Sequence, residues 1–454
     1  SGIASISLMT KPYGCPHGRC TFCPGGPNSA FGDVPQSYTG REPATMRAIR
    51  AGFDPYLQVF SRLEQYAVTG QSFDKVELII QGGTFPWMPQ DYKEEFAGYV
   101  FKAMNDFSKE FFGKGSDEID LRHYKEFFEM PGEFKNEERV RRVTERMLQL
   151  KKNSGYDSEK ETTAEFLLRQ QKINETAKVR CIGLTIETKP DWGKASHGDH
   201  MLKLGCTRVE LGIESVYEQQ LKLTNRGHTI KDTKESLQQL KDIGLKINAH
   251  YMLGLPGSSR ETDLEGLKEL FANPDYRPDM LKIYPCLVIR GTPLYLQWEK
   301  KQFTPITTAE AADVISEFKR FVPKWCRIMR VNRDIPTYVI SAGIDRTNLR
   351  QYVLQLQQQK GIICNCIRCR EIGRKGWSGK SEITVTEYEG SSGKEFFIAA
   401  DDPVNDAIIG FCRMRFPSQQ LREEITPATA IIRELHVYSS AVAIGEYPDE
   451  EKKM

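Results

Sequence analysis

Long apolar runs are absent from this chain of 454 residues. A membrane-spanning helix needs roughly 18 to 20 consecutive apolar residues, and no stretch approaches that length. A large net charge is also absent, because the formal charge is only +2, so the composition as a whole does not call for nucleic acid as a partner. We therefore expect a globular, cytoplasmic protein without a membrane partner, in which any nucleic-acid-binding surface is local.

Cysteine is present, but its distribution argues against a disulfide framework. Of the 11 cysteines, six form two tight triplets. Disulfide scaffolds are typical of short secreted chains, whereas clustered thiols in a long chain favour metal ligation in a reducing compartment. The length corresponds to about two to three domains of roughly 100 to 200 residues each. Because the chain opens on Ser1 rather than Met, we expect that an N-terminal piece is missing.

The first triplet is Cys15, Cys20 and Cys23 in KPYGCPHGRCTFCPGG, whose prolines and glycines predict an irregular loop. Four-iron clusters usually take four cysteine ligands, so a triplet without a nearby fourth leaves one iron open for chemistry. The pattern resembles the radical S-adenosylmethionine signature, in which the cofactor binds the open iron. The usual spacing there is CxxxCxxC, and this chain has CxxxxCxxC. A zinc knuckle that includes His17, or three unrelated thiols, are the alternatives.

Short β-rich apolar runs alternate with helix-compatible segments, which predicts repeated βα units with parallel strands. The expected strands are 3–9, 76–81, 180–187, 208–213, 246–252 and 280–284, and the expected helices are 44–67, 90–107, 230–243 and 262–272. The fold class is therefore α/β, with a partial β/α barrel. Chemistry in such barrels collects at the C-terminal ends of the strands. Gly82, Gly83, Thr84, Glu187, Glu214 and His250 are expected at that edge.

Two other regions depart from this alternation. Residues 117–163 are dominated by charge and read as a solvated helical insertion. From residue 376 onward the segments EITVTEYEG, EFFIAADD, AIIGFCRMRF and AIIRELHVY predict antiparallel strands, and therefore a second fold. Just before it, GIICNCIRCREIG carries the second triplet, Cys364, Cys366 and Cys369.

Taken together, the motifs resemble the family of the catalytic subunit of the Elongator complex, in its stand-alone archaeal or bacterial form. The resemblance spans nearly the full length and rests on ASISLMTKPYGCPHGRCTFCPGGP, QGGTFPWMP, GLTIETKPDW, GCTRVELGIESVYE, TNRGHT, LKIYPCLVIRGTPLY, VNRDIP, CIRCREIG and IIRELHVY. It implies a partial (β/α)6 radical S-adenosylmethionine barrel over residues 1–340, a zinc-loop linker over 341–375, and an incomplete α+β acetyltransferase domain of the GNAT type over 376–454.

The resemblance also implies a tRNA uridine acetyltransferase that carboxymethylates C5 of the wobble uridine. In the implied chemistry, a reduced cluster cleaves S-adenosylmethionine and the adenosyl radical abstracts hydrogen from the acetyl methyl of acetyl-CoA. The carbon radical adds to uridine C5, and thioester hydrolysis leaves a carboxymethyl group. A cofactor radical is a chemically sensible route, because side-chain acids and bases do not readily activate such a methyl group.

Site residues follow from the same resemblance. Cys15, Cys20 and Cys23 ligate the 4Fe-4S cluster; Gly82, Gly83, Thr84 and Glu187 bind S-adenosylmethionine; Lys282, His250 and Tyr284 are catalytic; Glu434, His436 and Val437 bind acetyl-CoA. Alternatives stay open at several of these positions. The glycines suit an ordinary strand-to-helix turn, His250 and His228 suit structural roles, and alternation could direct either Lys282 or Tyr284 outward.

Cys364, Cys366 and Cys369 resemble a structural Zn²⁺ loop at the domain junction. Cys326, Cys412, His436 or a residue outside the chain could supply the fourth ligand, and free buried thiols are the alternative.

Basic residues are concentrated between positions 319 and 333, without an acidic residue among them. The six are Lys319, Arg320, Lys324, Arg327, Arg330 and Arg333. They could pair with tRNA phosphates while Trp325 stacks on a base. A solvated helix face is the alternative, and the family resemblance favours tRNA.

Both ends depart from the family pattern, and at the N-terminal end the family's basic segment, which is expected to help hold tRNA, is missing. Family members continue beyond ELHVY into a QHxGxG stretch whose backbone amides would hold the acetyl-CoA pyrophosphate, whereas this sequence stops at Met454. We therefore expect this chain to bind acetyl-CoA poorly by itself. A protein lysine acetyltransferase with a structural cluster and a catalytically inactive tRNA-binding scaffold are the alternative functions. The sequence leaves open a homodimer, Elongator-like accessory subunits and the preferred tRNA.

Overall fold

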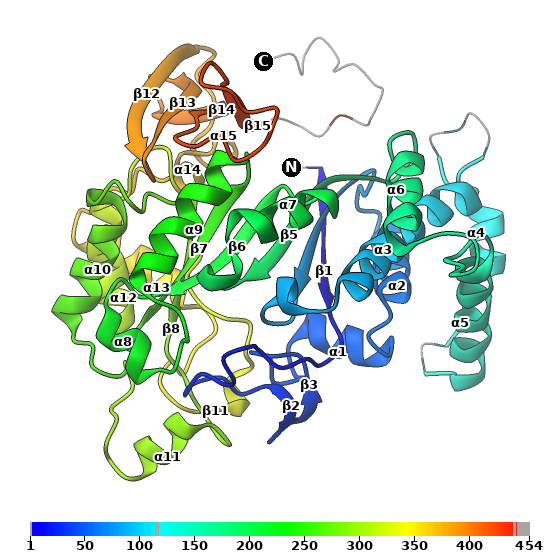
Figure 1. Ribbon diagram of the computed structural model, residues 1–454, viewed down its shortest axis with the longest axis horizontal. Coiled ribbons are helices and arrows are strands. Elements are labelled where there is room, and N and C mark those ends of the chain that lie inside the picture. Colours follow the sequence, from blue (N-terminus) through cyan, green and yellow to red (C-terminus); the bar gives the residue numbers. More distant parts are fainter. Residues whose placement is uncertain (1, 114–115, 117, 134, 439–441, 443–454) are drawn as a thin grey trace.

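The computed structural model describes residues 2–113, 116, 118–133, 135–438 and 442. Its main element is a parallel sheet of seven strands (Figure 1). In spatial order these are β1 (Ile3–Met9), β4 (Lys75–Gln81), β5 (Arg180–Thr188), β6 (Arg208–Glu214), β7 (Lys246–Leu253), β8 (Met280–Pro285) and β10 (Arg327–Arg330). The six expected strands are confirmed, as is the α/β fold class. The seventh strand, β10, was not expected, and the sheet stays open between its edges β1 and β10.

Helices connect and cover these strands. They are α1 (Pro43–Arg50), α2 (Pro55–Val68), α3 (Gln90–Phe111), α6 (Thr163–Asn174), α7 (Ala195–Lys203), α8 (Glu218–Leu223), α9 (Ile230–Asp242), α10 (Arg260–Ala272), α11 (Pro293–Glu299), α12 (Thr308–Phe318) and α13 (Leu349–Gln359). The single helix expected over 44–67 is two helices. Phe53 adopts a left-handed backbone with φ of 58°, and Asp54 then caps α2 by accepting a hydrogen bond from the Leu57 amide.

The charged insertion contains α4 (Leu121–Phe128) and α5 (Glu137–Lys152). α5 fits the solvated helix that was expected, since Val143 and Met147 are its only buried residues. α4 does not, because Phe127 and Phe128 are buried and their rings pack against Phe111 of α3. The insertion is therefore anchored to the barrel by aromatic side chains. The high content of charged residues around them led to the prediction of a fully solvated insertion.

A second sheet of four antiparallel strands follows, as expected. Its strands are β12 (Glu382–Gly390), β13 (Gly393–Asp402), β14 (Ala407–Phe416) and β15 (Ile431–Val437), paired in that order. The short elements β2 (Gly26–Ser29), β3 (Gly32–Val34), β9 (Val288–Ile289), β11 (Ile340–Ala342), α14 (Ile367–Arg370) and α15 (Ile372–Lys375) lie in the connections. The domain bounds 1–340, 341–375 and 376–454 stay a prediction. No described helix is both long and apolar enough to cross a membrane.

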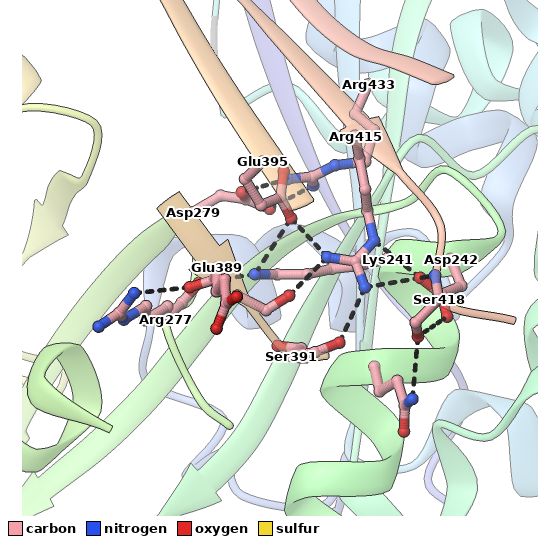
Figure 2. A network of polar contacts seen from close by, with 12 residues as sticks. Lys241, Asp242, Arg277, Asp279, Glu389, Ser391, Glu395, Arg415, Ser418 and Arg433 are labelled. Carbon is pink, nitrogen blue, oxygen red and sulfur yellow. Dashed lines mark hydrogen bonds and ion pairs between the residues drawn. The ribbon is translucent and has the colours of Figure 1, made fainter. Parts of the chain in front are cut away.

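Buried ion pairs join the two sheets (Figure 2). The Arg433 guanidinium on β15 donates two hydrogen bonds of 2.7 Å to the carboxylate of Asp279, which precedes β8, and a third of 2.7 Å to Glu395 on β13. Arg415 on β14 binds Glu395 and also Asp242 at the end of α9. These charges are inaccessible to solvent, so each must be compensated within the network. The network fixes the position of the antiparallel sheet against the barrel.

Candidate active site

A cavity of about 410 Å³ lies within the barrel. Its lining includes residues from β1, β4, β5, β6, β7 and β8, together with α1 and the segment around β10. The first cysteine triplet reaches it from the loop after β1, so Cys15, Cys20 and Cys23 share the cavity with Glu187 and His250, which are far away in sequence. The structure therefore brings together the residues that were expected at the C-terminal edge of the sheet.

Each thiol of the first triplet has a polar neighbour from a different segment. The Gln36 amide donates to Cys23 Sγ at 3.0 Å, the Arg226 guanidinium to Cys20 Sγ at 3.3 Å, and the Thr84 hydroxyl to Cys15 Sγ at 3.4 Å. Burial raises the pKa of Cys20 to about 11, and the Arg226 guanidinium opposes that shift. Because thiolates at these buried positions need positive charge nearby, this donor set suits sulfur ligands of an iron–sulfur cluster.

The spacing of the three sulfurs distinguishes a cluster from a single zinc ion. Three thiolates around one Zn²⁺ at about 2.3 Å each would lie within about 4.6 Å of one another. Among the described residues, Cys15, Cys20 and Cys23 do not form a set of donors within 4.8 Å, whereas the second triplet does. The first triplet therefore fits ligands that bind separate irons better than it fits a zinc knuckle.

The two glycines after β4 allow the backbone to pass close to the triplet. Gly82 and Gly83 have φ of 138° and 100°. A Cβ at Gly82 would lie 2.1 Å from the Thr10 hydroxyl, and one at Gly83 would lie 2.8 Å from Gln36 Cβ and 3.4 Å from Cys15 Sγ. An ordinary strand-to-helix turn would not require this close approach. The glycine pair therefore has the geometry expected of a backbone that borders a bound cofactor.

Glu187 closes the cavity beside these glycines. Its carboxylate accepts hydrogen bonds from the Tyr38 hydroxyl at 3.0 Å and, at 3.4 Å, from the Gly82 amide. Burial raises the pKa of Glu187, while His250 and Lys282 oppose the shift. The carboxylate is thus positioned at the cavity wall, where a polyhydroxylated group could replace Tyr38 as its donor.

Glu210 on β6 is the centre of a second polar group in the cavity. It accepts hydrogen bonds from His250 Nε2 at 2.5 Å, from Asn248 at 3.1 Å and from the Lys282 ammonium. Burial would lower the pKa of Lys282, but the Glu210 carboxylate reverses this effect and holds that pKa above its usual value. Lys282 is therefore a protonated donor that faces the cavity.

The expected catalytic residues occupy one wall. Lys282 and Tyr284 both line the cavity, as two positions on the same strand face must, so the alternative that one of them points outward is wrong. The Tyr284 ring meets the His250 ring edge to face at 5.3 Å. His228 does not line the cavity, and burial lowers its pKa to about 2. The role of His228 stays a prediction.

Comparison with known proteins identifies the family. Residues 127–270 match the radical SAM superfamily and residues 278–358 match the radical SAM C-terminal domain. A curated tRNA uridine(34) acetyltransferase of Methanocaldococcus infernus is 44% identical over 96% of this chain and 73% of its own length. The chain belongs to the tRNA uridine(34) acetyltransferase and Elongator complex protein 3 family. Human Elongator complex protein 3 is 37% identical over 98% of this chain and 73% of its own length.

The fold agrees with a solved member of the same family. The archaeal Methanocaldococcus infernus Elp3 with an N-terminal deletion matches with a TM-score of 0.74 and 36% identity, covering 97% of this chain and 84% of that chain. The radical SAM domain implies a 4Fe-4S cluster and S-adenosylmethionine. Cys15, Cys20 and Cys23 lie before the matched residues, and the cavity geometry connects them to that domain.

In this family member the second triplet forms a compact group at the domain junction. The sulfurs of Cys364, Cys366 and Cys369 lie within 4.8 Å of one another, which is compatible with a metal ion. Of the expected fourth ligands within the chain, Cys326 lies near Cys366, but its sulfur does not belong to the group within 4.8 Å. It is buried, it accepts the Ile367 amide hydrogen at its carbonyl, and the neighbouring Cys366 adds to burial in raising its pKa.

The six basic residues between 319 and 333 differ in burial, since Lys319 is buried while Arg320, Lys324 and Arg330 are exposed, and their RNA-binding role stays a prediction. Each already has a partner in the structure: Lys319 with Cys369, Arg320 with Glu317, Lys324 with Asp406, Arg327 with Glu371, Arg330 with Asp334, and Arg333 with the Ser37 carbonyl. Most of these partners come from segments distant in the sequence. The absence of acidic residues between positions 319 and 333 therefore did not mean that the basic side chains are unpaired. The solvated-helix alternative is also wrong, since the window contains strand β10.

Trp325 cannot act as the expected base-stacking residue. Its side chain is buried and lies parallel to the Tyr388 ring of β12, with ring centroids 4.3 Å apart. This stack packs the barrel against the antiparallel sheet. The expectation for Trp325 is therefore wrong, because the ring is used at the domain junction.

The residues expected at acetyl-CoA lie on β15 but do not converge. Glu434 pairs with Arg413 at 2.8 Å, the His436 ring stacks on Phe411, and Val437 is exposed. Their role stays a prediction. Sequence reasoning missed Gln36, Tyr38, Glu210 and Arg226. One signal was available, since Glu210 is a charged residue inside RVELGIE, a strand that is otherwise read as buried.

Proposed function

We propose that this chain is the catalytic part of a tRNA-modifying enzyme that carboxymethylates C5 of the wobble uridine with carbon from acetyl-CoA. The observation that carries the proposal is the convergence of two polar groups on one cavity. The cysteine triplet, Gly83 and Glu187 lie on one part of its lining, and the Glu210–His250–Lys282 group lies on another. The relatives named tRNA uridine(34) acetyltransferase supply the substrate class.

The chain's residues have distinct parts in this proposal. Cys15, Cys20 and Cys23 would hold the 4Fe-4S cluster, and the backbone at Gly82 to Thr84 together with Glu187 would hold S-adenosylmethionine. When bound, this pair supplies the one-electron chemistry that activates an otherwise inert C–H bond. Arg226 and Gln36 stabilise the thiolate sulfurs by donating hydrogen bonds to them.

Lys282 and His250 would act on the substrates. The protonated Lys282 amine, held by Glu210, is suited to donate to a carbonyl oxygen of the base or of the thioester. His250, bound to the same carboxylate, is suited to hold or move a proton during thioester hydrolysis. Because these groups are largely buried, the cavity would also exclude bulk water from a reactive centre.

Two further sites complete the proposal. We place a structural Zn²⁺ on Cys364, Cys366 and Cys369. We place acetyl-CoA at the edge of β15 that pairs with no described strand, with contacts from Val437 and from the backbone around Glu434 and His436. Those two side chains are engaged by Arg413 and Phe411, so they would order the strand rather than bind the ligand directly.

The test is mass spectrometry of tRNA nucleosides. The full-length, anaerobically reconstituted protein is incubated with tRNA, reductant, S-adenosylmethionine and acetyl-CoA labelled in its acetyl carbons. Label in a carboxymethylated wobble uridine supports the proposal. Unlabelled nucleosides, in a sample with intact cluster and bound tRNA, would overturn it. Labelled protein lysines without S-adenosylmethionine would indicate the lysine acetyltransferase instead.

A further inference from the structure

Three arginines on the first two helices form a cationic cluster outside the window that the sequence singled out. Arg47 and Arg50 lie on α1, and Arg62 lies on α2. Arg47 and Arg50 are three residues apart on one helix, and the Arg62 guanidinium lies over the Tyr66 ring, 4.3 Å from its centroid. Burial lowers the pKa of Arg47, and repulsion from Arg62 and Arg50 lowers it further. We call these three residues the α1–α2 arginine cluster.

The cluster has no carboxylate partner among the residues that the structure describes. Arg50 donates to the Met46 carbonyl, and Arg62 donates to the Gln65 amide oxygen and the Tyr66 hydroxyl. By contrast, Arg330 and Lys282 at the same cavity are both bound to carboxylates. Like charges three residues apart on a helix, as at Arg47 and Arg50, are mildly unfavourable. An external anion would remove that repulsion.

The position of the cluster connects it to the cavity. Arg47 contributes to the cavity lining, as do Pro43 and Ala44 of the same helix. α1 packs beside β1, one of the two edges between which the parallel sheet is open (Figure 1). Met329 and Arg330 line the cavity from the opposite edge, at β10. The cavity is therefore lined from both edges at which the parallel sheet is interrupted.

The chemistry of the cluster suits a nucleic-acid backbone. Guanidinium groups bind phosphate with paired hydrogen bonds, and a nucleic-acid backbone presents several phosphates to such a cluster. The same helix exposes Met46 and Ile49, by 40% and 45% of their surfaces, which offers apolar contact to a ribose or a base. A folded acidic protein would not need to reach into the gap beside Arg47.

We propose that Arg47, Arg50 and Arg62 bind phosphates of the RNA strand whose target base enters the cavity through the gap between β1 and β10. This inference rests on the proposed function, because it takes RNA as the substrate. It assigns the backbone contacts to the α1–α2 arginine cluster and not to residues 319–333, where four of the six basic side chains are paired with carboxylates.

The test is the salt dependence of RNA binding. A fluorescent anticodon stem-loop with a wobble uridine is titrated with the full-length protein, and anisotropy is recorded across a range of salt concentrations. The variant Arg47→Gln/Arg50→Gln/Arg62→Gln is compared with a charge-matched control, Arg122→Gln/Arg141→Gln/Lys160→Gln, whose residues are exposed on the insertion. Far-UV circular dichroism and thermal melting establish that each variant is folded.

The cluster variant is expected to bind at least about ten-fold more weakly at low salt. The slope of log Kd against log salt should fall by about 2, since each phosphate contact with a single strand contributes about 0.7. The control should match the native slope, and Arg→Lys replacements at the three cluster positions should retain most of it.

An unchanged slope in the folded cluster variant would overturn the inference, as would an equal loss in the control. These results are separable from failure of the proposed function. If the native protein labels the wobble uridine and the cluster variant binds RNA normally, only the assignment of the cluster fails. If the native protein does not label the nucleoside at all, the proposed function fails.

Discussion

Replacing Asp279 by Asn should weaken the attachment of the antiparallel sheet to the barrel and lower the free energy of unfolding. The Asp279 carboxylate is inaccessible, accepts two hydrogen bonds of 2.7 Å from Arg433 and accepts the Ile247 amide hydrogen at 2.9 Å. An amide of the same shape would remove the charge and turn an NH₂ group toward a guanidinium. Loss of one partner from a buried ion pair typically costs about 3–5 kcal/mol, so we expect a loss of that order in the free energy of unfolding.

The chain offers a matched control in an exposed pair of the same sheet. Glu387 lies 2.6 Å from Lys394, and both side chains are about half exposed, at 54% and 51%. Because such pairs contribute at most about 1 kcal/mol, Glu387→Gln should change stability little. The assay is urea unfolding monitored by tryptophan fluorescence. A parallel series that carries Trp325→Phe is subtracted from it, because the difference is the signal of the ring that stacks on Tyr388 across the junction.

The same variant gives a pH dependence with a defined sign. Although burial alone would raise it, the pKa of Asp279 is held well below its usual range by the Arg433 guanidinium. Its contribution is therefore fully present above the unfolded pKa of about 4 and is lost as the pH falls below that value. Asp279→Asn should flatten this acid limb. If the urea midpoint of Asp279→Asn moves no further than that of Glu387→Gln, the reasoning about the junction is refuted.

Three other predictions concern the sites. Glu210→Gln should shift the alkaline limb of the pH–activity profile to lower pH, because without that carboxylate burial lowers the pKa of Lys282; superimposable profiles would contradict this. Cys366→Ser should reduce zinc by elemental analysis while iron is retained, and unchanged zinc would refute the assignment. Gly83→Ala should reduce iron content, because the added Cβ would lie 2.8 Å from Gln36 Cβ. Gly373→Ala is the control, since a Cβ there would meet no atom within 4 Å. Equal iron content in the two variants would count against the role of Gly83.

Much of the barrel was predictable because its strands carry local signals. Alternation in KVELIIQ, for example, places Val76, Leu78 and Ile80 in the core, and β4 forms there. β10 was missed because RIMR lies in a basic window and contains only two apolar residues. The break between α1 and α2 depends on the left-handed backbone at Phe53, and an aromatic residue in the sequence does not predict that conformation.

The site was predictable where a motif carries the chemistry and unpredictable where tertiary pairing decides. The cysteine triplet was recognisable from its spacing, and the glycines after β4 were singled out by the family resemblance. The polar group centred on Glu210 could be predicted only with the strand register, which places Glu210 opposite Asn248 and His250 opposite Lys282. The basic window was misread for the same reason, since its carboxylate partners, such as Glu371 and Asp406, lie outside it.

The most direct test of the central claim is hydrogen transfer from acetyl-CoA. The full-length, reconstituted protein is incubated anaerobically with tRNA, reductant, S-adenosylmethionine and acetyl-CoA deuterated in its methyl group, and 5′-deoxyadenosine is analysed by mass spectrometry. The account predicts that 5′-deoxyadenosine gains one deuterium, and that the product is lost in Cys20→Ser. Formation of 5′-deoxyadenosine without deuterium while the wobble uridine is carboxymethylated, or carboxymethylation that persists in Cys20→Ser, would contradict it.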